Sequence, residues 1–129
     1  MSTTRKQVLW YDDGKRPNVA DELAKRPDIT VHRMTFQSAP ADAWGALSAS
    51  QVYCITSTRD EVPDEFKCHA ALLARCPDLL AVSTTGAGYD TVDVAACTEA
   101  GVLVVNQTGA NAEAVAEHTV AMLLSLTKK

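Results

Sequence analysis

Five short apolar segments, separated by stretches of helical character, constrain the fold of this chain more than any other feature. They are residues 7–11, 29–34, 51–56, 79–83 and 102–105. Continuous apolar runs of this length are typical of strands that are buried on both faces of a parallel sheet. The second segment alternates apolar and polar residues, which suits an edge strand. We therefore predict five parallel strands joined by right-handed crossovers.

Helices are predicted in the stretches between these strands. Pro17 and Pro40 each suit the first turn of a helix, and a third helix is expected to run unbroken over residues 63–74. A fourth is predicted over residues 92–100, with Gly101 as its C-terminal cap. This alternation predicts an α/β fold: a flavodoxin-like, five-stranded parallel sheet of order 2-1-3-4-5, with helices on both faces and a further helix at the C-terminus.

Length and composition narrow the classes of function. The chain has 129 residues, 47% of them hydrophobic and 22% charged, which is enough for one domain with a core. The net charge is −4 and the basic residues are scattered, so a nucleic-acid-binding role is not supported. No apolar run is long enough for a membrane span or a signal peptide. The expected compartment is therefore the cytoplasm.

The four cysteines lack the spacing of a metal site, and no Cys-x-x-Cys is present. We expect no bound metal. We expect the thiols to be reduced and mostly buried, as small apolar side chains. They are Cys54, Cys68, Cys76 and Cys97.

The segment Gly86-Ala87-Gly88 directly follows the fourth predicted strand. Ligands of open parallel sheets bind at the carboxyl ends of strands, and glycines allow a backbone N–H to approach an anion closely. A tight strand-to-helix turn is the alternative interpretation, with Asp90 and Asp93 as N-caps of the following helix. No Gly-x-Gly-x-x-Gly occurs anywhere in the chain, so a dinucleotide fingerprint is absent.

The last helix is predicted to begin at Asn111, either as an N-cap or as a ligand contact through its amide. Val115 belongs to an apolar stripe that needs a surface to cover it, so we expect the sequence to be part of a longer protein. Glu117-His118 could form an acid–base pair, although the apolar opposite face of the helix favours solvated or packed side chains. Asp12-Asp13, after the first strand, also suits a receiver-type phospho-acceptor site, but no Lys follows the fifth strand.

Three motifs make the chain resemble the D-isomer-specific 2-hydroxyacid dehydrogenase family. They are residues 85–93, residues 101–106, and the run from Asn111 through residues 115–119, in the family's order and near its spacing. The resemblance implies that residues 1–108 are a segment of a flavodoxin-like substrate domain. Residues 109–129 would then be a hinge helix that leads to an NAD-binding Rossmann domain absent from this chain.

The resemblance also implies roles for single residues. The backbone of Ala87 and Gly88 would bind the substrate carboxylate, Asn111 would orient its reacting end, and Val115 would pack near the nicotinamide. Glu117 would lie at the hinge. The family's catalytic Arg and His–Glu pair would come from a segment absent here, so no catalytic residue is expected in this chain; His118 is structural in the family motif. Thr56 stands where many relatives have an Arg, which argues against a phosphorylated substrate unless Arg59 replaces it.

The implied activity is NAD-dependent hydride transfer between a small 2-hydroxy acid and its 2-oxo acid, by a homodimer. We expect the 129 residues alone to be inactive. The alternative is a stand-alone truncated α/β module, without enzymatic activity, that binds a small molecule or self-associates through its last helix.

Overall fold

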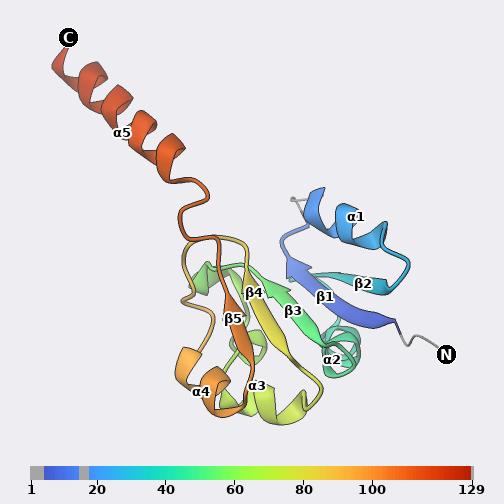
Figure 1. Ribbon diagram of the computed structural model, residues 1–129. Coiled ribbons are helices and arrows are strands. Elements are labelled where there is room, and N and C mark those ends of the chain that lie inside the picture. Colours follow the sequence, from blue (N-terminus) through green and yellow to red (C-terminus); the bar gives the residue numbers. More distant parts are fainter. Residues whose placement is uncertain (1–4, 15–17, 129) are drawn as a thin grey trace.

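A computed structural model describes residues 5–14 and 18–128. Its centre is a five-stranded, wholly parallel sheet of order β2-β1-β3-β4-β5 (Figure 1). This confirms the predicted sheet, its strand order and the edge position of the second strand. The strands are β1 (Lys6–Asp12), β2 (Ile29–Thr35), β3 (Val52–Ile55), β4 (Ala81–Thr84) and β5 (Leu103–Val105).

Helices cover both faces of the sheet, as predicted. The first packs on one face and the next three on the other, while the last extends away from the sheet (Figure 1). The α-helices are α1 (Asn18–Ala24), α2 (Pro40–Ser48), α3 (Ala70–Arg75), α4 (Val94–Glu99) and α5 (Ala112–Thr127), and two 3₁₀ turns are η1 (Arg59–Glu61) and η2 (Asp64–Phe66). Pro17, the predicted start of α1, lies outside the described residues.

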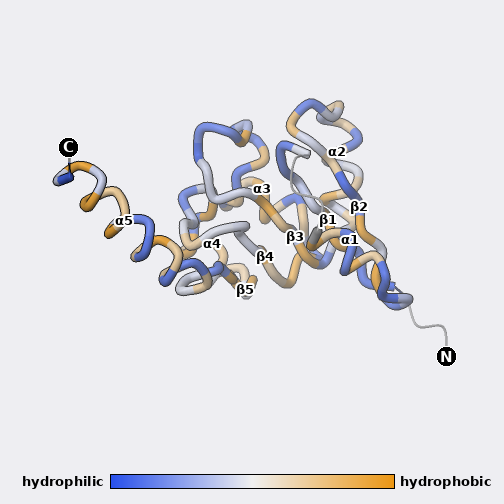
Figure 2. Tube along the Cα trace, turned by 90° about the horizontal axis from the view of Figure 1, so that it is seen from above, coloured by the Kyte–Doolittle hydropathy of each residue, from blue (hydrophilic) through white to orange (hydrophobic). Residues whose placement is uncertain are grey.

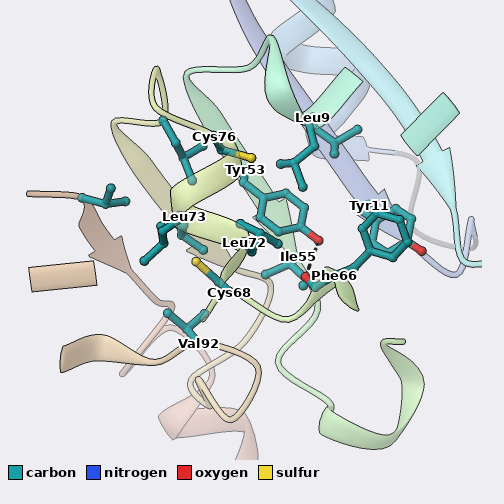
Figure 3. Close-up of a cluster of buried hydrophobic side chains, with 14 of the residues drawn as sticks. Leu9, Tyr11, Tyr53, Ile55, Phe66, Cys68, Leu72, Leu73, Cys76 and Val92 are labelled. Atoms are coloured by element: carbon teal, nitrogen blue, oxygen red, sulfur yellow. Dashed lines mark hydrogen bonds between the residues drawn. The ribbon is translucent and has the colours of Figure 1, made fainter. Parts of the chain in front are cut away.

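The larger core lies between the sheet and α2, α3 and α4, and aromatic side chains fill its centre (Figure 3). Tyr53 is fully buried, and its hydroxyl donates to the backbone carbonyl of Phe66 at 2.9 Å. The ring of Phe66 packs against Tyr11, with 4.9 Å between the ring centroids. These contacts attach η2 to the strands β1 and β3.

The continuous helix predicted over residues 63–74 was wrong. The structure has η2, a break at Cys68, and then α3 with His69 as its N-cap, whose Nδ1 accepts from Leu72 N at 3.3 Å. At the break, Cys68 N donates to Thr91 O and Asp93 N donates to Cys68 O, both at 2.8 Å. This short parallel bridge uses backbone groups that a continuous helix would have needed.

The same bridge delays the start of α4. That helix begins at Val94 rather than at Val92, and Asp93 is its N-cap, accepting from Ala96 N at 3.0 Å. Asp93 as N-cap confirms that prediction. Gly101 ends the helix with a φ of 71°, a conformation that favours glycine, as predicted.

All four cysteines are free thiols and buried, which confirms that prediction. Cys68 and Cys97 touch each other, with 3.6 Å between their Sγ atoms, and Cys54 lies in the smaller core under α1. Burial raises the pKa of the Cys54 thiol from 9.0 to about 11.

This shift predicts a loss of stability in alkali. Between pH 9 and pH 11 the unfolded chain releases the Cys54 proton while the folded chain keeps it. The unfolded state therefore binds fewer protons, and the free energy of unfolding falls as the pH rises, by roughly 2–3 kcal/mol for this group. Urea unfolding at several pH values measures the slope. In Cys54→Ala the free energy of unfolding should fall less steeply between pH 9 and pH 11. An unchanged slope in that variant would contradict the raised pKa of Cys54.

The last helix, α5, extends away from the sheet (Figure 1), and Figure 2 shows hydrophobic and hydrophilic residues alternating along it. No residue in the described helix is buried. Asn111 occupies the N-cap position, but its side chain makes no capping hydrogen bond, so the prediction of a side-chain cap was wrong. The reason lies in the backbone of Asn111, whose φ of −116° and ψ of 11° differ from the extended conformation in which an N-cap side chain reaches the N–H groups of the first turn.

The described residues contain neither a membrane-spanning helix nor a cluster of metal-binding side chains. Within residues 5–14 and 18–128, no helix is long and apolar enough to cross a membrane. Over the same ranges, no three His, Cys, Asp or Glu side chains gather as a metal site would require.

Candidate functional site

The carboxyl ends of β1, β3, β4 and β5 lie along one edge of the sheet, because all strands are parallel. The loop after β4 holds Gly86, Ala87 and Gly88, and β4 lies between β3 and β5 in the sheet (Figure 1). Ala87 and Gly88 are exposed, whereas Gly86 is half-buried. We call these three residues the glycine loop.

Neighbouring groups hold the carbonyls of the glycine loop. Thr84, at the end of β4 and fully buried, donates its hydroxyl to Gly88 O at 2.8 Å and approaches Gly86 O at 3.3 Å. Gln107 N donates to Gly86 O at 2.9 Å. The carbonyl of Ala87 accepts a hydrogen bond from Asn106 Nδ2 at 2.9 Å.

The backbone N–H groups of the glycine loop are free. In the described part of the chain, none of the three N–H groups donates to any acceptor. With every carbonyl bound and every N–H open, the loop presents donors without competing acceptors. Backbone N–H groups that have no protein acceptor are able to donate to an anion, and a carboxylate oxygen accepts such hydrogen bonds.

Ser57, the second residue after β3, packs against the glycine loop. A Cβ atom built on Gly86 would lie 2.8 Å from Ser57 Oγ, and one built on Gly88 would lie 3.4 Å from Ser57 Cβ. A side chain at residue 86 would therefore force the Ser57 hydroxyl to move, so glycine is favoured here by close approach of a neighbouring side chain rather than by a positive φ.

A second set of hydrogen bonds shapes the loop after β3. Thr91 Oγ1 donates to Thr56 O at 2.8 Å and so links this loop to the segment beyond the glycine loop. Thr56 is buried, and its own hydroxyl lies 3.4 Å from a carboxylate oxygen of Glu61. The exposed Arg59 lies beside Glu61 in η1.

The carboxylate of Asp12 has a structural role in this arrangement. It is buried at the end of β1, where it accepts from Trp10 Nε1 and from Gly14 N, both at 2.7 Å. Two donors on a buried carboxylate satisfy it within the fold and close the turn after β1. A receiver-type phospho-acceptor, by contrast, needs an accessible carboxylate.

The site residues predicted from sequence fall into two places. Ala87 and Gly88 belong to the glycine loop, whereas Asn111 and Val115 lie in the first turns of α5, where both are exposed. Within the described residues, no hydrogen bond joins Asn111 to the glycine loop. Glu117 and His118 follow further along α5 and are also exposed.

Sequence reasoning assigned no specific role to three contributors, namely Ser57, Thr84 and Asn106. All three occupy the carboxyl ends of strands or the residues just after them, which is the signal that could have found them. Their contacts depend on the conformation of the loops, which periodicity does not report.

Comparison with protein families identifies the family of this chain. Residues 8–129 match the family model described as D-isomer specific 2-hydroxyacid dehydrogenase, catalytic domain. The chain belongs to this family. The match includes nearly all of the sequence, so it covers residues 8–78, for which the sequence motifs had provided only a strand–helix pattern.

Individual relatives agree with the family match. The chain is 45% identical over 60 residues to D-3-phosphoglycerate dehydrogenase of Mycobacterium tuberculosis, an alignment that covers 46% of this chain and 11% of that protein. It is 44% identical over 57 residues to (S)-sulfolactate dehydrogenase of Chromohalobacter salexigens, covering 44% of this chain and 18% of that protein.

Solved structures share the fold over almost the whole chain. A 2-hydroxyacid dehydrogenase from Ketogulonicigenium vulgare aligns with a TM-score of 0.69 and 29% identity, covering 94% of this chain and 36% of that one. D-lactate dehydrogenase from Aquifex aeolicus, solved with NAD and lactic acid, aligns with a TM-score of 0.70 and 24% identity, covering 95% and 34%. This chain thus spans about a third of the length of the solved relatives.

Proposed function

We propose that this chain is the substrate-binding segment of an NAD-dependent D-2-hydroxyacid dehydrogenase, and that the glycine loop holds the carboxylate of a 2-hydroxy or 2-oxo acid. One observation carries the proposal: among the described residues, the carbonyls of the glycine loop all accept hydrogen bonds, whereas its N–H groups donate none. Family membership supports the substrate class, because 2-hydroxy acids have a carboxylate next to the reacting carbon.

In this proposal the chain binds and orients its substrate. The N–H groups of Ala87 and Gly88 donate to the carboxylate, and Thr84 keeps the loop in shape from below. The amide of Asn111 orients the hydroxyl or oxo group, and Val115 offers an apolar contact to the nicotinamide. Both residues are exposed at the start of α5, as contacts to a ligand and a cofactor require. Fixing the reacting carbon in this way lowers the entropic part of the barrier.

The cofactor of this proposal is NAD, which supplies or accepts the hydride. The chain's own residues do not fit a dinucleotide site, because its sequence has no Gly-x-Gly-x-x-Gly and the glycine loop is shorter than that motif. We therefore propose that residues 1–108 form the substrate-domain segment and residues 109–129 a hinge helix that leads to a separate Rossmann domain. The low coverage of the relatives, about a third of the solved chains, supports this division.

Titration calorimetry tests the carboxylate site. D-lactate is the smallest chiral 2-hydroxy acid, and D-lactamide is its neutral match, so the two differ mainly in the group that the glycine loop would hold. We expect D-lactate to bind at least about tenfold more tightly, because hydrogen bonds to a charged acceptor exceed those to a neutral one by this order. Equal affinity for the two ligands would contradict the proposal.

The same division predicts that the purified 129-residue chain does not oxidise NADH. It supplies a carboxylate site, but the acid–base pair and the cofactor domain of the proposed enzyme lie outside residues 1–129. The measurement is the absorbance of NADH at 340 nm over a panel of 2-oxo acids, with a D-lactate dehydrogenase as the positive control. Turnover above the blank by protein of the expected 13.8 kDa would contradict the prediction.

The exposed apolar side chains of α5 favour a second candidate function, self-association without catalysis. Large apolar residues along this helix are about half exposed or more, which is unusual for an isolated helix surface. They are Val115, Val120, Met122, Leu123, Leu124 and Leu126. A homodimer is part of both candidates. Light scattering decides whether the chain forms dimers, and the calorimetry above separates a module without ligand affinity from a substrate-binding segment.

A further inference from the structure

Ser57 is placed to be a ligand-binding residue. It follows β3, is half-buried, and packs its side chain against both glycines of the glycine loop. Its Oγ lies 2.8 Å from the Cβ position of Gly86 and 3.6 Å from that of Gly88. No other side chain of the described residues approaches the Gly86 position within 4 Å.

The hydroxyl of Ser57 has no hydrogen-bond partner in the described part of the chain, although its neighbours do. Thr56, one residue earlier, and Thr58, one residue later, both take part in hydrogen bonds of the turn. Thr84, on the adjacent strand, donates to the glycine loop. A serine hydroxyl carries one donor and two acceptor sites, so Ser57 has a free donor beside a loop whose N–H groups are also free.

We propose that Ser57 Oγ donates a third hydrogen bond to the carboxylate held by the N–H groups of Ala87 and Gly88. This inference rests on the proposed function and names a further residue of the same site. A carboxylate has four lone-pair positions, and two backbone donors leave others open to a hydroxyl. Because Ser57 comes from β3 and the glycine loop from β4, the carboxylate would bridge the two central loops of this edge.

Two variants separate this role from simple packing. Ser57→Ala keeps the Cβ that packs against the glycine loop and removes only the hydroxyl, whereas Ser57→Thr keeps the hydroxyl. The matched control is Ser48→Ala, because Ser48 is exposed on α2 and bonds only to Gly45 O at 3.3 Å. Calorimetry with D-lactate and D-lactamide gives the affinities, and thermal unfolding reports stability.

We expect Ser57→Ala to weaken D-lactate binding about tenfold, the loss of one hydrogen bond to a charged group. The neutral D-lactamide should lose at most about threefold, and the melting temperature should stay within about 1 °C of the wild type, as for a surface substitution. Ser57→Thr should restore most of the affinity, and Ser48→Ala should match the wild type.

Different results would contradict the role of Ser57 and the carboxylate site itself. If the wild type binds D-lactate and Ser57→Ala binds it equally well, the role of Ser57 is overturned while the proposed function stands. A loss that is equal for D-lactate and D-lactamide, or that follows a fall in melting temperature, assigns Ser57 to packing alone. If the wild type binds neither ligand, the carboxylate site itself is overturned, and the role of Ser57 falls with it.

Discussion

Replacing Phe66 by alanine should remove about 3–5 kcal/mol from the free energy of unfolding, the largest effect we expect from a single substitution. Phe66 is 2% exposed and contacts two aromatic rings, with centroids 4.9 Å from Tyr11 and 5.2 Å from Trp44. Alanine would leave a cavity where η2 meets the sheet, because short 3₁₀ turns depend on such anchoring side chains. Urea unfolding followed by circular dichroism measures the change.

Phe36→Ala is the matched control for that cavity. Phe36 also contacts Tyr11, at 5.1 Å between centroids, but it is only partly buried. Truncation of Phe36 should lower the free energy of unfolding clearly less than truncation of Phe66, because solvent can fill part of the vacated space. Equal costs for the two variants would show that η2 is not anchored by Phe66 and would contradict the packing described above.

Thr84→Val should have the largest effect on the glycine loop. Valine has nearly the shape of threonine but lacks the hydroxyl that donates to Gly88 O at 2.8 Å. We expect a loss of about 1–2 kcal/mol in the free energy of unfolding, since a fully buried donor is removed and its acceptors lose a partner. The loop should also lose its fixed shape, and D-lactate affinity should fall at least about tenfold through lost preorganisation.

Calorimetry and urea unfolding of the same protein measure both consequences of Thr84→Val. The matched control is Thr98→Val, because the Thr98 hydroxyl also donates to a backbone carbonyl at 2.8 Å, that of Val94, but is exposed on α4. This control should leave ligand affinity unchanged. If Thr84→Val retained full affinity for D-lactate, the hydroxyl would not be the support of the glycine loop.

The fold could be predicted from sequence to the level of strand order. Apolar runs such as residues 7–11 and 51–56 indicate strands that are buried on both faces of a sheet. The helical segments between them indicate crossover connections between parallel strands. The interruption at Cys68 could not be predicted, because it depends on a backbone bridge to Val92, 24 positions away in the sequence. Local helical periodicity contains no information on such a long-range pairing.

The candidate site was only partly visible in the sequence. Gly86 and Gly88 marked the loop after β4, and strand ends marked the edge of the sheet where it lies. The hydrogen bonds from Thr84 and Asn106 to the carbonyls of the glycine loop could not be predicted. They depend on the conformation of the loops, which a sequence pattern does not specify. Asn111 illustrates the opposite case: its residue type predicted a side-chain cap, but its backbone is not in the extended conformation from which such a cap forms.

The central claim is that the backbone N–H groups of Ala87 and Gly88 hold the substrate carboxylate. Amide ¹⁵N–¹H spectra of the isotope-labelled chain, recorded during titration with D-lactate and then with D-lactamide, test it at single-residue resolution. We expect the amide resonances of Ala87 and Gly88 to move the most and to saturate with D-lactate, and to move little with D-lactamide. Saturable shifts confined to other residues, or equal shifts with both ligands, would contradict the claim.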